Sequence, residues 1–72
     1  MTIYNLTVKQ AEILEHIKTF IETNRHSPTI REIAVLADIS APTAYVHLQH
    51  LKHKGAIGSS EGRPRTIIVL ID

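Results

Sequence analysis

The sequence predicts a small, mainly α domain in which three helices are followed by a β-hairpin. Apolar residues recur at helical spacing in three segments before residue 55, and a capping residue precedes each segment. After Gly55 the spacing changes, and β-branched residues crowd the last positions. The chain has 72 residues, 43% of them hydrophobic, which suffices for one core. We therefore expect a single domain over residues 1–72.

The first helix is predicted over about residues 8–23. A short lead-in, residues 1–6, precedes it. Thr7 and Gln10 have the spacing of a capping box, in which each side chain bonds the backbone N–H of the other residue. Leu14, Ile17 and Ile21 repeat at helical spacing and form the predicted buried side.

The second helix is predicted over residues 30–37. Thr29 suits its N-cap, and Glu32 stands at the reciprocal position of a second capping box. Ile33 and Ala34 belong to its predicted buried stripe. A short turn follows, in which Ile39 is expected as an apolar plug between two helices.

The third helix is predicted over about residues 42–54. Ser40 or Ala41 is expected to cap it, and Pro42 suits the first turn because a proline nitrogen has no N–H to satisfy. Gly55 is the expected residue at its C-terminal end. Its core side is expected to carry Ala44, Leu48 and Leu51.

The hairpin is predicted over about residues 56–71, with a first strand from residue 56, a polar turn over 59–64 and a second strand over 65–71. Alternation within the second strand turns Ile67, Val69 and Ile71 toward the core and leaves Ile68 and Leu70 on the other face. Two interpretations of that pair stay open. The first helix or the lead-in covers it, or it is a contact surface for self-association.

A three-helix domain with a short turn between its second and third helices and a terminal hairpin has the plan of a winged helix-turn-helix. In that plan the third helix enters the DNA major groove, and the hairpin, the wing, reaches the backbone or minor groove. A three-helix domain without a nucleic-acid role is the alternative, because fold alone does not fix function.

The charges place an anion-binding face in the second half of the chain. The formal net charge is only +1, yet residues 1–40 sum to −1 and residues 41–72 to +2. No apolar run approaches the roughly 20 residues of a membrane span, and there is no cysteine, which excludes disulfides. We expect a cytoplasmic, prokaryotic or phage-type protein. With no catalytic constellation and no phosphate-binding glycine loop, we expect no enzyme, cofactor or small-molecule substrate.

Helical geometry assigns an outward face to the third helix. Thr43, Gln49 and His50 offer hydrogen-bonding groups to base edges, while Val46 and the ring of Tyr45 suit thymine methyl groups. For Tyr45, packing against the second helix stays open. Contacts with the DNA backbone are expected from Thr29, Lys52, His53, Lys54, Arg63 and Arg65. The alternative for the two arginines is an ordinary solvated turn.

Three histidines, His47, His50 and His53, share one arc of the third helix. Their spacing resembles that of metal ligands, but no carboxylate or cysteine stands beside them, so we expect no metal site. Their protonation is instead expected to add positive charge to this helix as pH falls.

The residues also resemble those of a known family, the N-terminal DNA-binding domain of LexA, the bacterial SOS repressor. The resemblance rests on Leu6-Thr7, residues 10–14, Ser27-Pro28-Thr29, Glu32-Ile33-Ala34, Ala41-Pro42, Ala44, His47-Leu48, Leu51 and residues 54–57. It implies DNA binding by the third helix. The positions that match base-contacting residues of the family are Ala41, Thr43, Ala44, Tyr45 and Val46.

Two departures from the family matter. LexA proteins of the enterobacterial type carry acidic residues where this chain has Tyr45 and Val46, so a different operator is expected. The 72 residues contain no counterpart of the self-cleaving C-terminal domain, so self-cleavage and dimerisation through it are not expected of them.

The sequence therefore predicts a sequence-specific transcriptional regulator, most simply a repressor, acting on double-stranded DNA. Two alternatives stay open. One is a protein-interaction module that associates with another regulator, and the other is the DNA-binding fragment of a longer LexA-like repressor. A homodimer is a further expectation, because one copy has few phosphate contacts.

Overall fold

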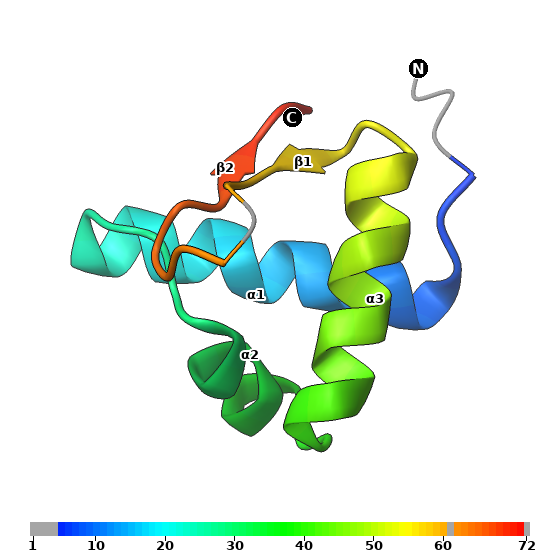
Figure 1. Cartoon of the computed structure of the whole chain (residues 1–72), viewed down its shortest axis with the longest axis horizontal. Helices are drawn as coiled ribbons and strands as arrows, with labels where there is room; N and C mark the ends of the chain where they lie inside the picture. Colours follow the sequence, from blue (N-terminus) through cyan, green and yellow to red (C-terminus); the bar gives the residue numbers. More distant parts are fainter. Residues whose placement is uncertain (1–4, 61, 72) are drawn as a thin grey trace.

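The computed structural model describes residues 5–60 and 62–71. Three helices and a two-stranded antiparallel hairpin follow one another along the chain, which confirms the predicted fold class (Figure 1). Their bounds are α1 Val8–Asn24, α2 Ile30–Ala37, α3 Ala41–His53, β1 Ile57–Gly58 and β2 Ile68–Val69. Each helix begins and ends within one residue of its predicted bound. Residues 1–4 of the expected lead-in lie outside the described residues.

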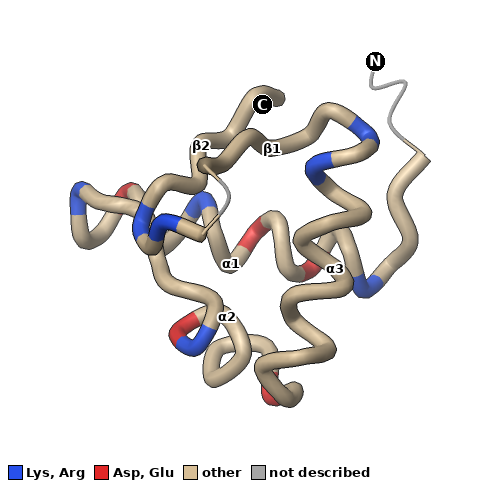
Figure 2. Tube along the Cα trace, viewed as in Figure 1, with Lys and Arg blue, Asp and Glu red and all other residues tan. Residues whose placement is uncertain are grey.

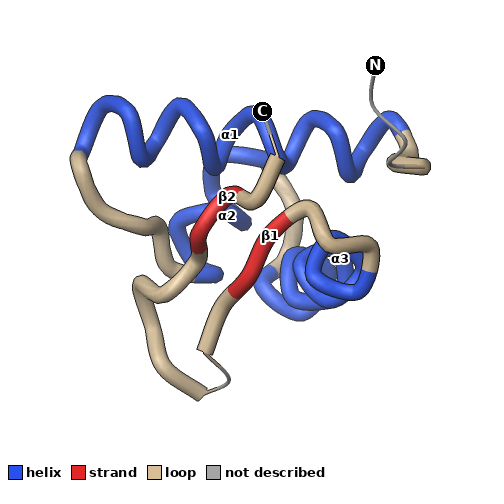
Figure 3. The backbone as a smooth tube through the Cα atoms, turned by 90° about the horizontal axis from the view of Figure 1, so that it is seen from above, coloured by secondary structure: helices blue, strands red, loops and turns tan. Residues whose placement is uncertain are grey.

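The helices surround one apolar core, and the hairpin closes it. The long helix α1 runs across α3, and α2 packs against both (Figure 1). Seen from above, β1 lies between β2 and α3, while β2 lies on the side of α1 (Figure 3). The core consists of Ile13, Leu14, Ile17, Ile33, Ala34, Ala44, Leu48, Leu51, Ala56, Ile57 and Ile67. This packing leaves one side of α3 facing outward, beside the loop of the hairpin.

Side-chain caps start all three helices. Both predicted capping boxes are present: Thr7 with Gln10 at α1, and Thr29 with Glu32 at α2. In the second, the Thr29 N–H donates to Glu32 Oε1 at 2.8 Å, and the Glu32 N–H donates to Thr29 Oγ1 at 3.2 Å. Of the two candidates for α3, Ser40 is the N-cap, and its Oγ accepts from the Thr43 N–H. The starts of the helices are thus set by hydrogen bonds between residues three positions apart, which can be predicted from the sequence.

The end of α3 explains why glycine stands at position 55. The Ala56 N–H donates to the Leu51 carbonyl at 2.9 Å, and the Gly55 N–H donates to the Lys52 carbonyl at 3.1 Å. This pair of bonds is a Schellman motif, which requires a left-handed residue directly after the helix cap. Gly55 has φ = 80°, a conformation that glycine adopts without a steric penalty. The chain is thereby turned from α3 into β1.

The hairpin is shorter than predicted. Ile57 pairs with Val69 and Gly58 with Ile68, and the second strand does not extend back to residue 65. Arg65 lies in a turn with φ = 57°, a left-handed conformation outside the extended region of regular strands. The predicted alternation is correct. Ile67 is buried and Val69 and Ile71 pack on the core, while Ile68 and Leu70 are 57% and 55% exposed.

Candidate nucleic-acid interface

The outward face of α3 is solvent-accessible along the first two turns of the helix. Tyr45 and Val46 are 42% and 50% exposed, and Thr43 is exposed as well. Ala44 is 0% exposed, which agrees with its predicted core position and contradicts the base contact implied by the family resemblance. A side chain between α3 and the core cannot also face a DNA groove. Ala41 and Gln49 are partly exposed.

The start of α3 holds its polar groups in fixed positions. Ser40 Oγ donates to Thr43 Oγ1 at 2.8 Å and accepts from the Thr43 N–H at 3.3 Å. Because Thr43 Oγ1 acts as an acceptor in this pair, its own hydrogen remains available to donate to a ligand. The cap therefore orients one hydroxyl donor at the front of the helix.

A second network ties the far end of α3 to the start of α1. The buried side chain of Gln10 accepts through Oε1 from the Thr7 N–H at 3.2 Å and from Lys54 Nζ at 2.8 Å. Lys54 Nζ also donates to the Asn5 carbonyl. With Oε1 occupied by donors, Gln10 Nε2 donates to His50 Nδ1 at 3.3 Å. These bonds assign a neutral His50 its proton on Nε2, where it is a donor for a ligand.

Charge favours anion binding at the same end of the molecule. The sequence of α3 contains no acidic residue, and Lys52, His50 and His53 occupy its last turn. Lysines and arginines of the second half lie at the end of α3 and on the loop between β1 and β2 (Figure 2). The first half of the chain differs, because α1 carries the acidic residues Glu12, Glu15 and Glu22. The distribution agrees with the basic second half expected from the sequence.

A cleft of about 500 Å³ separates the wing from the helices. It is lined by residues 28–31 at the start of α2, by Tyr45, Leu48 and Gln49 of α3, and by hairpin residues between 57 and 67. Arg31 of α2 and Arg63 of the hairpin are among the residues that line it, and both are exposed. Neither guanidinium is paired with another side chain within residues 5–60 and 62–71. Two unpaired cations therefore border a cleft that opens beside α3.

Arg31 was not among the residues predicted for DNA contact. The signal was present in the sequence, because the capping box at Thr29 places Arg31 in the first turn of α2. Since Ile33 and Ala34 define the buried side of that helix, Arg31 must point away from the core. Its cleft neighbours come from distant parts of the chain, which the local pattern does not reveal.

Arg65 is engaged in a different way from Arg63. Its Nη1 and Nη2 donate to Glu32 Oε1 and Oε2, both at 3.1 Å, in a bidentate pair. Nη1 also donates to the Ser27 carbonyl at 3.1 Å. The Thr29 N–H, followed by the Arg65 guanidinium, holds the pKa of Glu32 below its ordinary value. This pairing differs from the expectation of an arginine that is free to contact phosphate.

The described residues do not offer a metal centre. Within residues 5–60 and 62–71, no three His, Cys, Asp or Glu side chains are grouped so that they could hold a metal ion. In the same part of the chain, no helix combines the length and apolar character needed to cross a membrane.

Three helices, a hairpin wing, and an exposed third helix without acidic residues together define a winged helix-turn-helix of the DNA-binding class. The chain belongs to the LexA DNA binding domain family, whose model matches residues 3–66. The resemblance noted in the sequence is thereby confirmed.

Curated relatives agree with this membership. The LexA repressor of Staphylococcus carnosus (strain TM300) is 38% identical over 68 residues, which are 93% of this chain and 33% of the relative. The LexA repressor of Thermotoga neapolitana is 42% identical over 65 residues, 90% of this chain and 33% of the relative. The chain thus spans about a third of the length of the curated relatives that it matches.

Proposed function

We propose that this chain binds double-stranded DNA in a sequence-specific manner and serves as the DNA-binding part of a transcriptional repressor. The observation that carries the proposal is the exposed outward face of α3, which has no acidic residue and stands beside a cleft lined in part by Arg31 and Arg63. Membership of the LexA DNA-binding domain family supports it. A cytoplasmic location follows from such a role.

In this proposal α3 lies in the major groove. Thr43 Oγ1, the Gln49 amide and His50 Nε2–H meet polar base edges. The half-exposed Val46 and the ring of Tyr45 meet thymine methyl groups, and Ala41 borders the groove. Tyr45 and Val46 carry no charge, so we expect the preferred operator of this chain to differ from that of LexA proteins with acidic residues on this face.

Backbone contacts come from residues that line the cleft and from the end of α3. Arg63 on the wing and Arg31 on α2 are the two unpaired cations placed to meet phosphates. Further contacts are assigned to Thr29, Lys52, His53 and Lys54. Arg65 is left out of this set because its positive charge is paired with the Glu32 carboxylate, whereas the bonds of Lys54 Nζ described above go to the neutral oxygens of Asn5 and Gln10.

Useful affinity requires two copies on paired half-sites about one helical turn apart, because a single module makes few phosphate contacts. Ile68 and Leu70, exposed on the outer face of the hairpin, are the proposed self-association surface. Sedimentation at two concentrations tests this surface. The Leu70→Lys variant is expected to abolish any concentration-dependent association and to leave the circular dichroism spectrum unchanged.

A salt titration of binding to mixed-sequence duplex DNA tests the central proposal. The logarithm of the affinity should fall steeply and linearly with the logarithm of salt concentration. The reason is that cationic side chains of the protein displace counterions from the phosphates when they bind. As a matched control, Lys18→Gln removes one cation from α1 and should leave the slope unchanged. An affinity that is negligible at low salt overturns the proposal.

The second candidate function is a protein-interaction module. It is favoured by the exposed Ile68 and Leu70, next to a groove of about 850 Å³ between α1 and the hairpin. Such a module would show no steep salt-dependent binding to DNA. Selection of bound duplexes from a random pool then separates specific from non-specific DNA binding and reports any half-site spacing.

A further inference from the structure

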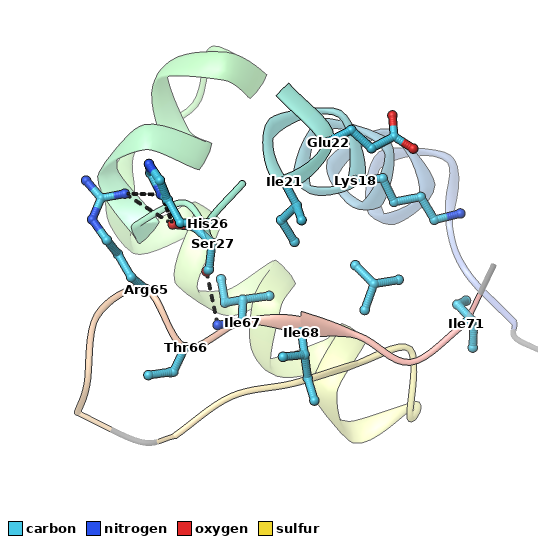
Figure 4. A pocket seen from close by; sticks show the side chains of 11 residues that line it. Lys18, Ile21, Glu22, His26, Ser27, Arg65, Thr66, Ile67, Ile68 and Ile71 are labelled. Carbon is cyan, nitrogen blue, oxygen red and sulfur yellow. Dashed lines mark hydrogen bonds between the residues drawn. The ribbon is translucent and has the colours of Figure 1, made fainter. Parts of the chain in front are cut away.

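One arginine of the wing, Arg65, bonds to residues at and before the start of α2. Arg65 reaches back over the α1–α2 connection, where its guanidinium meets Ser27 and His26 (Figure 4). The same guanidinium forms the bidentate pair with Glu32 at 3.1 Å. The α1–α2 connection and the first turn of α2 are therefore both bonded to one side chain of the wing, which lies 33 to 39 residues further along the sequence.

A neighbouring bond holds the backbone of the wing to the same connection. The Ile67 N–H donates to Ser27 Oγ at 3.0 Å, a contact also drawn in Figure 4, and this hydroxyl is buried. Ser27 Oγ in turn donates to the Pro28 carbonyl. The base of the wing thus has two attachments, one through the Arg65 side chain and one through the Ile67 backbone.

The tip of the wing is coupled internally to its base. Thr66 Oγ1 donates to the Arg63 carbonyl at 3.0 Å and accepts from the Ser60 N–H at 2.9 Å. The Arg63 N–H donates to the Ser60 carbonyl at 3.1 Å. Because Thr66 directly follows Arg65 and bonds both Arg63 and Ser60, the position of Arg65 is linked to the turn that carries Arg63.

The backbone of Arg65 is itself held in an unfavourable region. Its φ of 57° is left-handed, where residues other than glycine are uncommon and depend on surrounding contacts. Glycine would adopt this conformation freely but would supply no guanidinium. A long side chain in this position is therefore explained by the contacts that it makes.

We propose that Arg65, through its pair with Glu32, is a positioning residue that sets where Arg63 meets the DNA backbone. The inference rests on the proposed DNA-binding function and deepens it. The wing then has two arginines with separate tasks. Arg63 contacts phosphate, and Arg65 fixes the distance between the wing and α2.

The deciding variant is Glu32→Gln. Glutamine preserves the capping box at Thr29, since it is also accepted at this position, but it removes the charge that pairs with Arg65. Loss of an acidic residue near DNA would by itself tighten binding. The proposal requires the opposite: affinity for mixed-sequence DNA weaker by about three- to ten-fold, the size expected when one charge-assisted phosphate contact is misplaced. Glu12→Gln, which removes a charge from α1, is the matched control.

A double-mutant cycle then shows whether Glu32 acts through Arg63. In an Arg63→Ala background, Glu32→Gln should no longer weaken binding, because the contact that it positions is already gone. Arg65→Lys, which keeps the charge but loses the bidentate geometry, should weaken binding as Glu32→Gln does. Thermal unfolding of each variant excludes loss of folding as the cause.

Tighter or unchanged binding by Glu32→Gln overturns the positioning role while leaving DNA binding intact, and so does an additive effect with Arg63→Ala. Absence of DNA binding by the unaltered chain overturns the proposed function and the positioning role together. The two failures are therefore distinguished by the unaltered chain alone.

Discussion

The two faces of α3 differ in what determines their residues. The inner face consists of Ala44, Leu48 and Leu51, all buried against the core. The outer face carries Thr43, Tyr45, Val46, Gln49 and His50, which form no part of that core. Packing restricts the inner residues to apolar side chains of limited volume. The outer residues are not limited by the core, although Thr43 and His50 also form bonds within the domain. Substitutions on the two faces should therefore affect different measurements.

The largest effect is expected from the inner face. Leu51 is 0% exposed, so Leu51→Ala should lower the free energy of unfolding by about 2–5 kcal/mol, through lost burial and a cavity. Such a loss is comparable to the whole stability of a small domain. Chemical denaturation followed by circular dichroism measures it. Val46→Ala, on the outer face, should change the unfolding free energy by less than about 0.5 kcal/mol. Equal losses at the two positions would remove the distinction between the faces.

The wing, which lies outside the core, should determine how tightly DNA is bound without changing which DNA sequence is preferred. Arg63→Ala should weaken binding to all DNA sequences alike and reduce the salt slope by about one, the value for one lost phosphate contact. Fluorescence anisotropy at several salt concentrations provides both numbers. An unchanged slope would show that Arg63 is an ordinary solvated residue of a turn.

The outer face of α3 should determine which DNA sequence is preferred. Replacing Val46 or Gln49 should alter discrimination at one or two base pairs, by about 1–3 kcal/mol per position, while the salt slope stays the same. Selection from a random DNA pool with each variant reads this change directly. If both variants select the same sequences as the unaltered chain, α3 does not read the bases.

A smaller effect is expected where α3 meets the hairpin. Gly55→Ala places a methyl group on a residue with φ = 80°, which should cost about 1–2 kcal/mol of stability. Gly55→Asn should cost less, because asparagine tolerates the left-handed region better. Thermal unfolding of the two variants should therefore rank asparagine above alanine.

The smallest effect concerns pH. The pKa of Glu32 lies below its ordinary value, so the folded state binds this proton more weakly than the unfolded state. The contribution of Glu32 to stability is therefore complete above the unfolded pKa and is lost as pH falls through the folded pKa. An NMR titration of the Glu32 carboxyl should show the depressed midpoint, and Arg65→Lys should raise it. A midpoint that Arg65→Lys does not move would show that the pair is weak in solution.

Local pattern predicted most of the fold. Both capping boxes, the glycine after α3 and the alternation of Ile67, Ile68 and Val69 follow from spacing within a few residues. The long-range polar bonds did not follow from it. The links from Gln10 to His50 and from Glu32 to Arg65 span 40 and 33 residues. No periodicity encodes such pairs, because the fold brings them together.

The same distinction applies to the candidate site. The outward arc of α3 could be placed from helical geometry, and only Ala44, carried over from the family, was on the wrong face. In the wing, however, Arg63 and Arg65 are equivalent in the sequence and different in the structure. The difference arises because residue 65 turns back toward Glu32 in a left-handed conformation.

The most direct test of the account is a titration of the isotopically labelled chain with a selected DNA duplex, followed by backbone amide NMR. We expect the largest amide shifts at Thr43, Tyr45, Val46 and Gln49 and in the wing loop around Arg63. Shifts should be small at Ile68 and Leu70 and in the part of α1 that lines the protein groove beside the hairpin. Shifts concentrated on Ile68, Leu70 and α1, or no shifts at all, would contradict DNA binding through α3 and the wing.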